Sequence, residues 1–136
     1  MFSGEEVNIA LELIDMVLQV PGQKDYVVNV YERNGTVLGY YCVGPTPATV
    51  GTFDMYWIAV TPSAHGQGVG TVLNTHAEQL IADRGGRLII VETSSRPAYE
   101  STRAFYRRRE YVELARIRGY YRPDDDLVVY GKFLSL

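Results

Sequence analysis

The chain has 136 residues, of which 46% are hydrophobic and 21% are charged. This is the composition of an ordinary globular protein rather than of a disordered or fibrous one. A chain of this length is expected to form a single domain, residues 1–136, and to bury a substantial core. No repeat, low-complexity tract or linker divides the sequence.

The formal net charge of -3 gives no basis for nucleic-acid binding, which usually needs a strongly basic surface. No apolar run approaches the ~20 residues of a membrane-spanning helix, and no secretory signal is visible. Cys42 is the only cysteine, so an intrachain disulfide is excluded. These features predict a cytoplasmic protein without nucleic-acid or membrane partners.

The first part of the chain predicts a helix followed by a hairpin. Ser3-Gly4-Glu5-Glu6 is typical of a capping box, and apolar residues follow at helical spacing until Pro21-Gly22. Two strands are expected at 26–33 and 36–43, because Asn34-Gly35 between them is a strong hairpin turn signal.

The rest of the chain alternates strands and helices, recognised by apolar periodicity and by glycine or proline at their ends. In chain order we expect a loop at 44–51, a strand at 52–60, a helix at about 68–84, a strand at 87–93, a helix at about 99–109, and strands near 111–119 and 127–134 around the acidic turn Asp124-Asp125-Asp126. This order predicts an α/β domain with helices flanking a mixed sheet. Antiparallel hairpins and one parallel pair are expected, the latter joined by a right-handed crossover through the helix after the glycine-rich turn.

One junction between a strand and a helix has the pattern of a ligand-binding turn. The strand that ends in Val60 passes through Pro62 into a glycine-rich turn that opens a helix. Gly66, Gly68 and Gly70 remove side chains where the first helical N–H groups lack internal partners. Together with the helix dipole, these groups favour an anion, most naturally a phosphate or pyrophosphate. A Walker loop needs a lysine that is absent here, and the spacing Gly-x-Gly-x-Gly does not match a dinucleotide loop.

Together with a second motif, this junction resembles the GNAT superfamily of acetyl-CoA-dependent N-acyltransferases. Its first signature is a strand ending Val-x-Pro, then Arg/Gln-x-x-Gly-x-Gly/Ala. Val60, Pro62 and His65-Gly66-Gln67-Gly68-Val69-Gly70 match this signature. The second is Asn-x-x-Ala-x-x-Phe-Tyr-x-x-x-Gly-Phe, whose core is matched by Phe105-Tyr106 and Tyr111.

The resemblance covers about residues 26–136, and the stretch 119–130 looks like the ending of the protein N-terminal acetyltransferase branch. The chain departs from the family pattern at Tyr99, Thr102 and Glu110, which replace Asn, Ala and Gly. A non-glycine residue is penalised at positive φ, so loss of that glycine predicts a different helix end. The family usually begins with a strand, and that N-terminal strand is here missing or supplied elsewhere.

By this resemblance acetyl-CoA is the co-substrate, and no histidine has a nearby partner that suggests a metal site. The N–H groups of the turn would bind the CoA pyrophosphate, and the main chain of β-residues Ile58 and Val60 would pair with the pantetheine arm. The implied cofactor-binding residues are Ile58, Val60, His65, Gly66, Gln67, Gly68, Val69, Gly70, Thr71 and Arg103. Arg103 or Arg107 would meet the CoA 3′-phosphate; the alternative is that both belong to a solvated helix face.

Acetyl transfer to an amine needs a base for the amine and an acid for the departing thiolate. The resemblance makes Tyr106 the acid, with its phenol near the CoA sulfur. Two carboxylates are candidates for the base, acting directly or through water. Glu92 stands where the N-terminal acetyltransferase branch places a glutamate, and Asp54 stands where the histone-acetylating branch places one.

These features predict an N-acetyltransferase that moves the acetyl group of acetyl-CoA to a primary amine by direct attack. A small-molecule amine is the favoured acceptor, and a protein or peptide N-terminus is the alternative. A second alternative is a non-catalytic acyl-CoA-binding module, against which the retained Tyr106 argues. A homodimer is one assembly that the resemblance allows.

Overall fold

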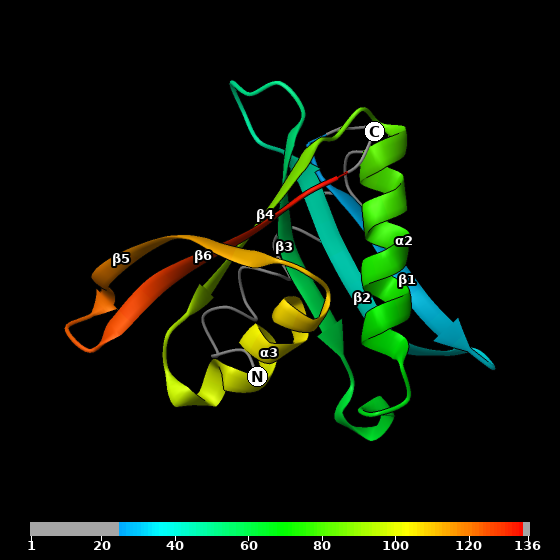
Figure 1. Cartoon of the computed structure of the whole chain (residues 1–136). Helices are drawn as coiled ribbons and strands as arrows, with labels where there is room; N and C mark the ends of the chain where they lie inside the picture. Colours follow the sequence, from blue (N-terminus) through cyan, green and yellow to red (C-terminus); the bar gives the residue numbers. More distant parts are fainter. Residues whose placement is uncertain (1–24, 135–136) are drawn as a thin grey trace.

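The computed structural model describes residues 25–134. They form one mixed sheet of order β1-β2-β3-β4-β6-β5 with two helices (Figure 1). The elements are β1 (Val27–Arg33), β2 (Thr36–Pro45), β3 (Thr52–Val60), α2 (Val69–Asp83), β4 (Leu88–Ser94), α3 (Glu100–Arg108), β5 (Val112–Arg122) and β6 (Asp125–Phe133), with 3-10 turns at Pro62–Ala64 and Pro97–Tyr99. The predicted α/β class with a mixed sheet is confirmed. The helix expected after Ser3 and the question of a missing N-terminal strand lie outside the described residues.

The β1–β2 hairpin forms where the Asn-Gly pair predicted it. Arg33 pairs with Thr36, and Asn34 and Gly35 between them have φ values of 53° and 78°. Positive φ at both turn positions matches the right-handed twist of the flanking strands, and Asn-Gly tolerates it at little cost.

The predicted parallel pair consists of β3 and β4, which are connected through α2. The pairing is short: it joins residues 52–54 to residues 88–90 and does not continue beyond them. The two strands diverge from this point (Figure 1). All other neighbouring strands are antiparallel.

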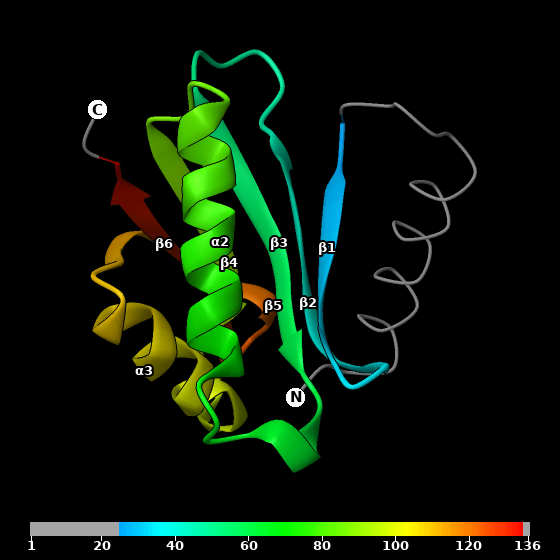
Figure 2. The same ribbon diagram turned by 90° about the vertical axis from the view of Figure 1, so that its right-hand side faces the viewer.

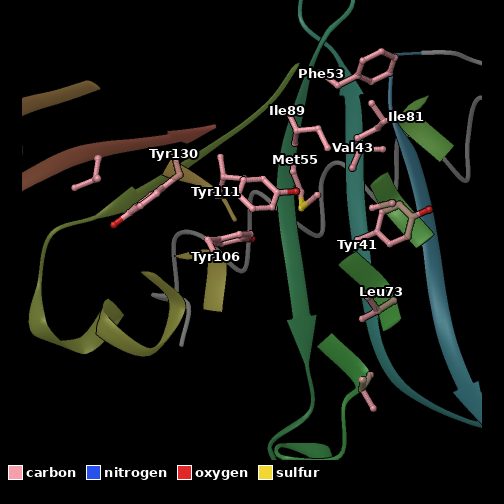
Figure 3. Packing of buried hydrophobic residues seen from close by; sticks show 14 of the residues in the cluster. Tyr41, Val43, Phe53, Met55, Leu73, Ile81, Ile89, Tyr106, Tyr111 and Tyr130 are labelled. Carbon is pink, nitrogen blue, oxygen red and sulfur yellow. The ribbon is translucent and has the colours of Figure 1, made fainter. Parts of the chain in front are cut away.

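The core lies between the sheet and the two helices, which cover the same face of the sheet (Figure 2). Phe53 and Met55 of β3 and Ile89 and Val91 of β4 are buried there. Side chains alternate along a strand, so the residues between them point to the opposite face. The aromatic core members include Tyr41, Tyr106, Tyr111 and Tyr130 (Figure 3). Along residues 25–134, no helix has the length and apolarity that a membrane span requires.

The last hairpin is longer than the sequence predicted. β5 continues to Arg122 and β6 begins at Asp125, so most of the acidic segment belongs to a strand. Asp126 accepts hydrogen bonds from the Gly119 N–H at 2.9 Å and from Arg116 at 3.2 Å. These contacts stabilise the charged Asp126 carboxylate and connect the two strands of the hairpin. They join residues on different strands, so the local sequence pattern did not predict them.

The end of α3 corrects one expectation. Glu110 takes a φ of 70°, the left-handed conformation that a glycine would provide. Its N–H bonds the Arg107 carbonyl and the Tyr111 N–H bonds the Tyr106 carbonyl, each at 3.0 Å, which is a Schellman arrangement. The helix therefore ends as it would with glycine, and the surrounding bonds hold Glu110 in a strained conformation.

Candidate active site

A gap opens between β3 and β4 beyond their three paired residues. β3 continues to pair with β2, as the positions of Ile58 opposite Tyr41 and Val60 opposite Gly39 show. Its other edge has no strand partner after Asp54 among residues 25–134. Such an edge presents backbone N–H and C=O groups to an extended ligand.

At the end of β3 the chain turns through the glycine segment into α2. Gly66 and Gly68 have φ values of 79° and 80°, and a Cβ at either position would meet nothing within 4 Å. Glycine is needed there for its conformation and not because of crowding. Gly70 differs, since a Cβ on it would lie 3.2 Å from the Phe105 ring.

The first turn of α2 is open to an anion. The Val72 N–H bonds the Gly68 carbonyl at 3.1 Å, so the N–H groups of residues 69–71 precede the helical ladder. No side chain caps the helix, and its first turn contains no acidic residue. The positive end of the helix dipole is therefore uncompensated within the described part of the chain, which suits a phosphate.

The polar side chains of the turn hold its shape. His65 Nε2 lies 3.0 Å from the Val60 carbonyl oxygen. Gln67 accepts a hydrogen bond from Arg33 at 3.0 Å and donates one to the Ser63 carbonyl at 3.3 Å. Since both side chains point back to protein groups, contacts to an anion fall to the backbone of the turn.

Tyr106 lies on α3, on the side of the sheet that carries Met55, and its side chain is beside Tyr111 (Figure 3). It is 5% exposed, and its ring makes edge contacts with Phe105 and Tyr111 at 5.4 and 5.3 Å between centroids. Within residues 25–134 its hydroxyl has no hydrogen-bond partner, and burial raises its pKa. The phenol is therefore protonated at neutral pH and can act as a proton donor.

Asp54 and Glu92 point away from the core, because their neighbours Phe53, Met55 and Val91 are buried. Asp54 accepts a hydrogen bond from Thr46 Oγ1 at 2.8 Å. Glu92 is exposed and makes no hydrogen bond within the described part of the chain. Partial burial and the negative charge of Asp54 both raise the pKa of Glu92.

Tyr56 interacts with Asp54, one of these two carboxylates. Burial, followed by the charge of Asp54 and a hydrogen bond to its carboxylate, raises the pKa of Tyr56 to about 12. Asp54 is thus engaged by two neighbours, Thr46 and Tyr56, while Glu92 remains available.

Arg103 lies away from the glycine turn. Its guanidinium is buried and donates to the carbonyls of Ser94 at 2.6 Å and Arg96 at 2.9 Å, and it pairs with Glu100 at 2.9 Å. Arg107 pairs with the same glutamate at 2.5 Å. These contacts tie the start of α3 to the end of β4, which favours a structural role for Arg103.

Arg109 is a residue that the sequence reasoning passed over. It donates to Thr71 Oγ1 in the first turn of α2, and its guanidinium lies over the Phe105 ring, 4.7 Å from the centroid. Arg109 follows Phe105 by four residues, and side chains at this spacing are neighbours at a helix surface. This spacing could have predicted the contact between the two residues.

An open cavity of about 560 Å³ lies between α3 and the β5–β6 hairpin. Its charged residues pair with one another or with Asp126, for example Arg116 with Glu113 at 3.1 Å. None of the glycine-turn residues and neither Asp54 nor Glu92 lines it. The β3–β4 gap is therefore the better candidate site. Among residues 25–134, no group of three His, Cys, Asp or Glu side chains is placed to hold a metal ion.

The sequence matches the family described as "Acetyltransferase (GNAT) domain" over residues 24–113. The chain belongs to the GNAT acetyltransferase family. The matched segment contains the diverging strands, the glycine turn and Tyr106. The resemblance drawn from the two sequence motifs is confirmed.

Solved structures share this GNAT fold. A Desulfovibrio desulfuricans protein assigned to the GNAT family is 36% identical, with a TM-score of 0.95 over 99% of this chain and 85% of that one. An aminoglycoside 6′-N-acetyltransferase complexed with coenzyme A is 16% identical, with a TM-score of 0.76 over 90% and 78%. The ribosomal-protein-S18-alanine N-acetyltransferase from Escherichia coli is 18% identical, with a TM-score of 0.73 over 90% and 77%. The last two show the fold alone.

A curated relative, the mycothiol acetyltransferase of Thermomonospora curvata, is 36% identical over 75 residues. The match covers 52% of this chain and 25% of the relative. The matched part of the chain therefore spans about a quarter of that relative's length.

Proposed function

We propose that this GNAT domain transfers the acetyl group of acetyl-CoA to a primary amine. The proposal is supported by three features on one side of the domain or at the edge of β3. β3 diverges from β4, the glycine turn lies at the end of β3, and Tyr106 is a buried residue whose hydroxyl makes no hydrogen bond with the described residues. A neighbour with the same fold was crystallised with coenzyme A, which supports the choice of cofactor.

The residues present fit a phosphate-bearing cofactor. Gly66 and Gly68 leave open space where side chains would stand, and the first turn of α2 has neither a capping side chain nor an acid. The N–H groups of Gly66 and of residues 68–71 would hold the pyrophosphate. The free edge of β3 around Ile58 would hold the pantetheine arm by backbone hydrogen bonds. Acetyl-CoA supplies the thioester that reacts. Arg103 is not among the proposed phosphate ligands, because its guanidinium binds the Ser94 and Arg96 carbonyls and the Glu100 carboxylate.

Acid and base would then act from opposite faces of the sheet. Glu92 accepts a proton from the ammonium form of the substrate, and the neutral amine nitrogen forms a bond to the acetyl carbonyl carbon. The carbon–sulfur bond would break and Tyr106 would donate its proton to the departing sulfur. The excess proton on the acylated nitrogen would then return through solvent to the Tyr106 oxygen and restore the phenol. Tyr106 belongs to the core and Glu92 points to the opposite face of the sheet, so an acetyl group held between β3 and β4 would be approached by the two residues from opposite sides.

Glu92 is the better candidate for the base. Its exposed carboxylate makes no hydrogen bond with the described residues, and its pKa is raised, which strengthens it as a base. The Asp54 carboxylate is held by Thr46 and Tyr56. A carboxylate oxygen that already accepts a hydrogen bond within the protein is less available to a substrate ammonium group.

The acceptor proposed is a small primary amine. Asp54 and Glu92 make the outer face of the gap acidic, and a protonated amine is attracted there before it loses its proton. A peptide N-terminus carries the same ammonium group, so the acceptor test includes both classes.

The proposal is tested by thiol release from acetyl-CoA with a panel of polyamines, amino sugars, amino acids and short peptides with free N-termini. Turnover with a small amine is expected, and it should fall in Glu92→Gln. Turnover with peptides alone would show that the acceptor is a peptide N-terminus and not a small amine. Binding of acetyl-CoA without turnover on any amine would contradict a transferase and favour a CoA-binding module.

A further inference from the structure

Arg109 is placed against the first turn of α2 by two independent contacts. Its Nη2 donates to Thr71 Oγ1, and its guanidinium stacks on Phe105. Phe105 itself packs on the second residue of that helix, since a Cβ on Gly70 would lie 3.2 Å from the ring. α3 lies beside α2 in this region (Figure 2). The cation therefore belongs to the same surface as the glycine turn.

The guanidinium lies beside a helix terminus that favours an anion. The N-terminus of a helix carries the positive end of its dipole, so an acid is the favoured neighbour and a cation is not. The first turn of α2 contains no acid, and Arg109 forms no ion pair within the described part of the chain. The nearby Arg103, Arg107 and Arg116 differ, because each is paired with a carboxylate.

A second sign is an unmet donor. The Arg109 Nε is buried and has no acceptor among the described residues. Buried donors of a charged group are normally satisfied, and exceptions point to a missing partner or a functional role. Arg109 thus places a cation beside a helix N-terminus and leaves its Nε without an acceptor. Such departures from the usual pattern are expected at functional sites.

We propose that Arg109 binds the phosphate-bearing half of acetyl-CoA, adding a guanidinium to the N–H groups of the glycine turn. This inference rests on the proposed function, since it assigns a further residue to the same cofactor. A guanidinium presents paired donors that match phosphate oxygens, and stacking on Phe105 holds its plane in place. Thr71 acts as the anchor that sets the distance to the helix terminus.

The test compares two ligands on two variants. Isothermal titration calorimetry measures the Kd of acetyl-CoA and of S-acetylpantetheine, which lacks the phosphates, for the full chain and for Arg109→Met. The expected result is roughly tenfold weaker binding of acetyl-CoA by the variant, a typical value for one charged hydrogen-bonded contact. The Kd of S-acetylpantetheine should be unchanged. Arg108→Met is the matched control, because Arg108 is an exposed neighbour on α3, and it should bind both ligands as the parent does.

An unchanged acetyl-CoA Kd in Arg109→Met would overturn the inference, and so would an equal loss for both ligands, which would mark a structural role. If the parent chain fails to bind acetyl-CoA, the proposed function fails instead. A second measurement needs no folded variant. The Arg109 Nε–H signal in the nitrogen-15 spectrum of the parent should shift with acetyl-CoA and not with S-acetylpantetheine, and a signal that stays in place with both would also refute the proposal.

Discussion

Asp54 and Glu92 lie on the same face of the sheet, on the two strands that separate just beyond Asp54. Asp54 is held by Thr46 and Tyr56, whereas Glu92 is exposed and free of hydrogen bonds within residues 25–134. The closeness of two negative charges raises the proton affinity of the one that is less stabilised. This relationship divides the roles of the two carboxylates and leads to a prediction on pH.

Removing the charge of Asp54 should shift the pH dependence of catalysis. A base must be deprotonated, so kcat/KM rises with pH through the pKa of Glu92. Burial and Asp54 both raise that pKa, and Asp54→Asn removes the second cause. The acid limb of the kcat/KM profile should move to lower pH in Asp54→Asn and flatten in Glu92→Gln. Glu113→Gln, on the distant strand β5, is the control, and a limb that stays in place in Asp54→Asn would contradict the pairing.

Tyr106→Phe should lower turnover without loss of stability. The hydroxyl has no partner among the described residues, so its removal should change the free energy of unfolding by less than about 1 kcal/mol. Loss of a general acid should reduce kcat by roughly 100-fold or more, with the Kd of acetyl-CoA unchanged. Steady-state kinetics, calorimetry and thermal unfolding measure the three quantities.

Tyr111→Phe is the matched control for Tyr106→Phe. The Tyr111 hydroxyl donates to the Glu78 carboxylate at 2.9 Å, and its oxygen lies 3.3 Å from Asn74 Oδ1. Its removal should destabilise the fold by about 1–3 kcal/mol, since a hydrogen bond to the Glu78 carboxylate is lost in the core. The kcat should be retained at a temperature where the variant is folded. The opposite pattern, with activity lost only in Tyr111→Phe, would reject Tyr106 as the acid.

Gly66→Ala should weaken acetyl-CoA binding. Gly66 has a φ of 79° with open space around a Cβ, so alanine would strain the turn that presents the N–H groups. Gly35 in the β1–β2 turn has a φ of 78° and equally open space, so Gly35→Ala imposes the same strain elsewhere. Both should lose roughly 1 kcal/mol of stability, and only Gly66→Ala should raise the Kd of acetyl-CoA. Equal Kd values for the two variants would count against phosphate binding at the turn.

Glu110→Gly should stabilise the protein. Glu110 occupies the left-handed position of the Schellman arrangement with a φ of 70°. Glycine adopts this conformation without the Cβ penalty, so a gain of roughly 1 kcal/mol and a Tm a few degrees higher are expected. Glu110→Ala keeps the penalty and serves as the control. A Tm that falls in Glu110→Gly would show that the glutamate side chain makes a stabilising contact.

The glycine turn and the first hairpin could be predicted because their information is local. Asn34-Gly35 specifies its turn through the φ values that these two residues tolerate. Val60 to Gly70 predicted a strand, an open turn and a helix, since strand pattern and glycine spacing act over a few residues. The family was identified from this junction together with Phe105, Tyr106 and Tyr111, and the match over 24–113 confirms it.

The amino-acid sequence by itself determined the element order, the parallel pair and the pool of charged residues available to the site. Only the tertiary structure decided which of those residues meet. Arg103 pairs with groups at the end of β4, while Arg109 reaches Thr71, 38 residues away in sequence. Asp54 is engaged and Glu92 is free, although both follow the same strand alternation. The physical reason is that backbone conformation depends on neighbours along the chain, whereas hydrogen bonds and ion pairs depend on distances that the packed elements set.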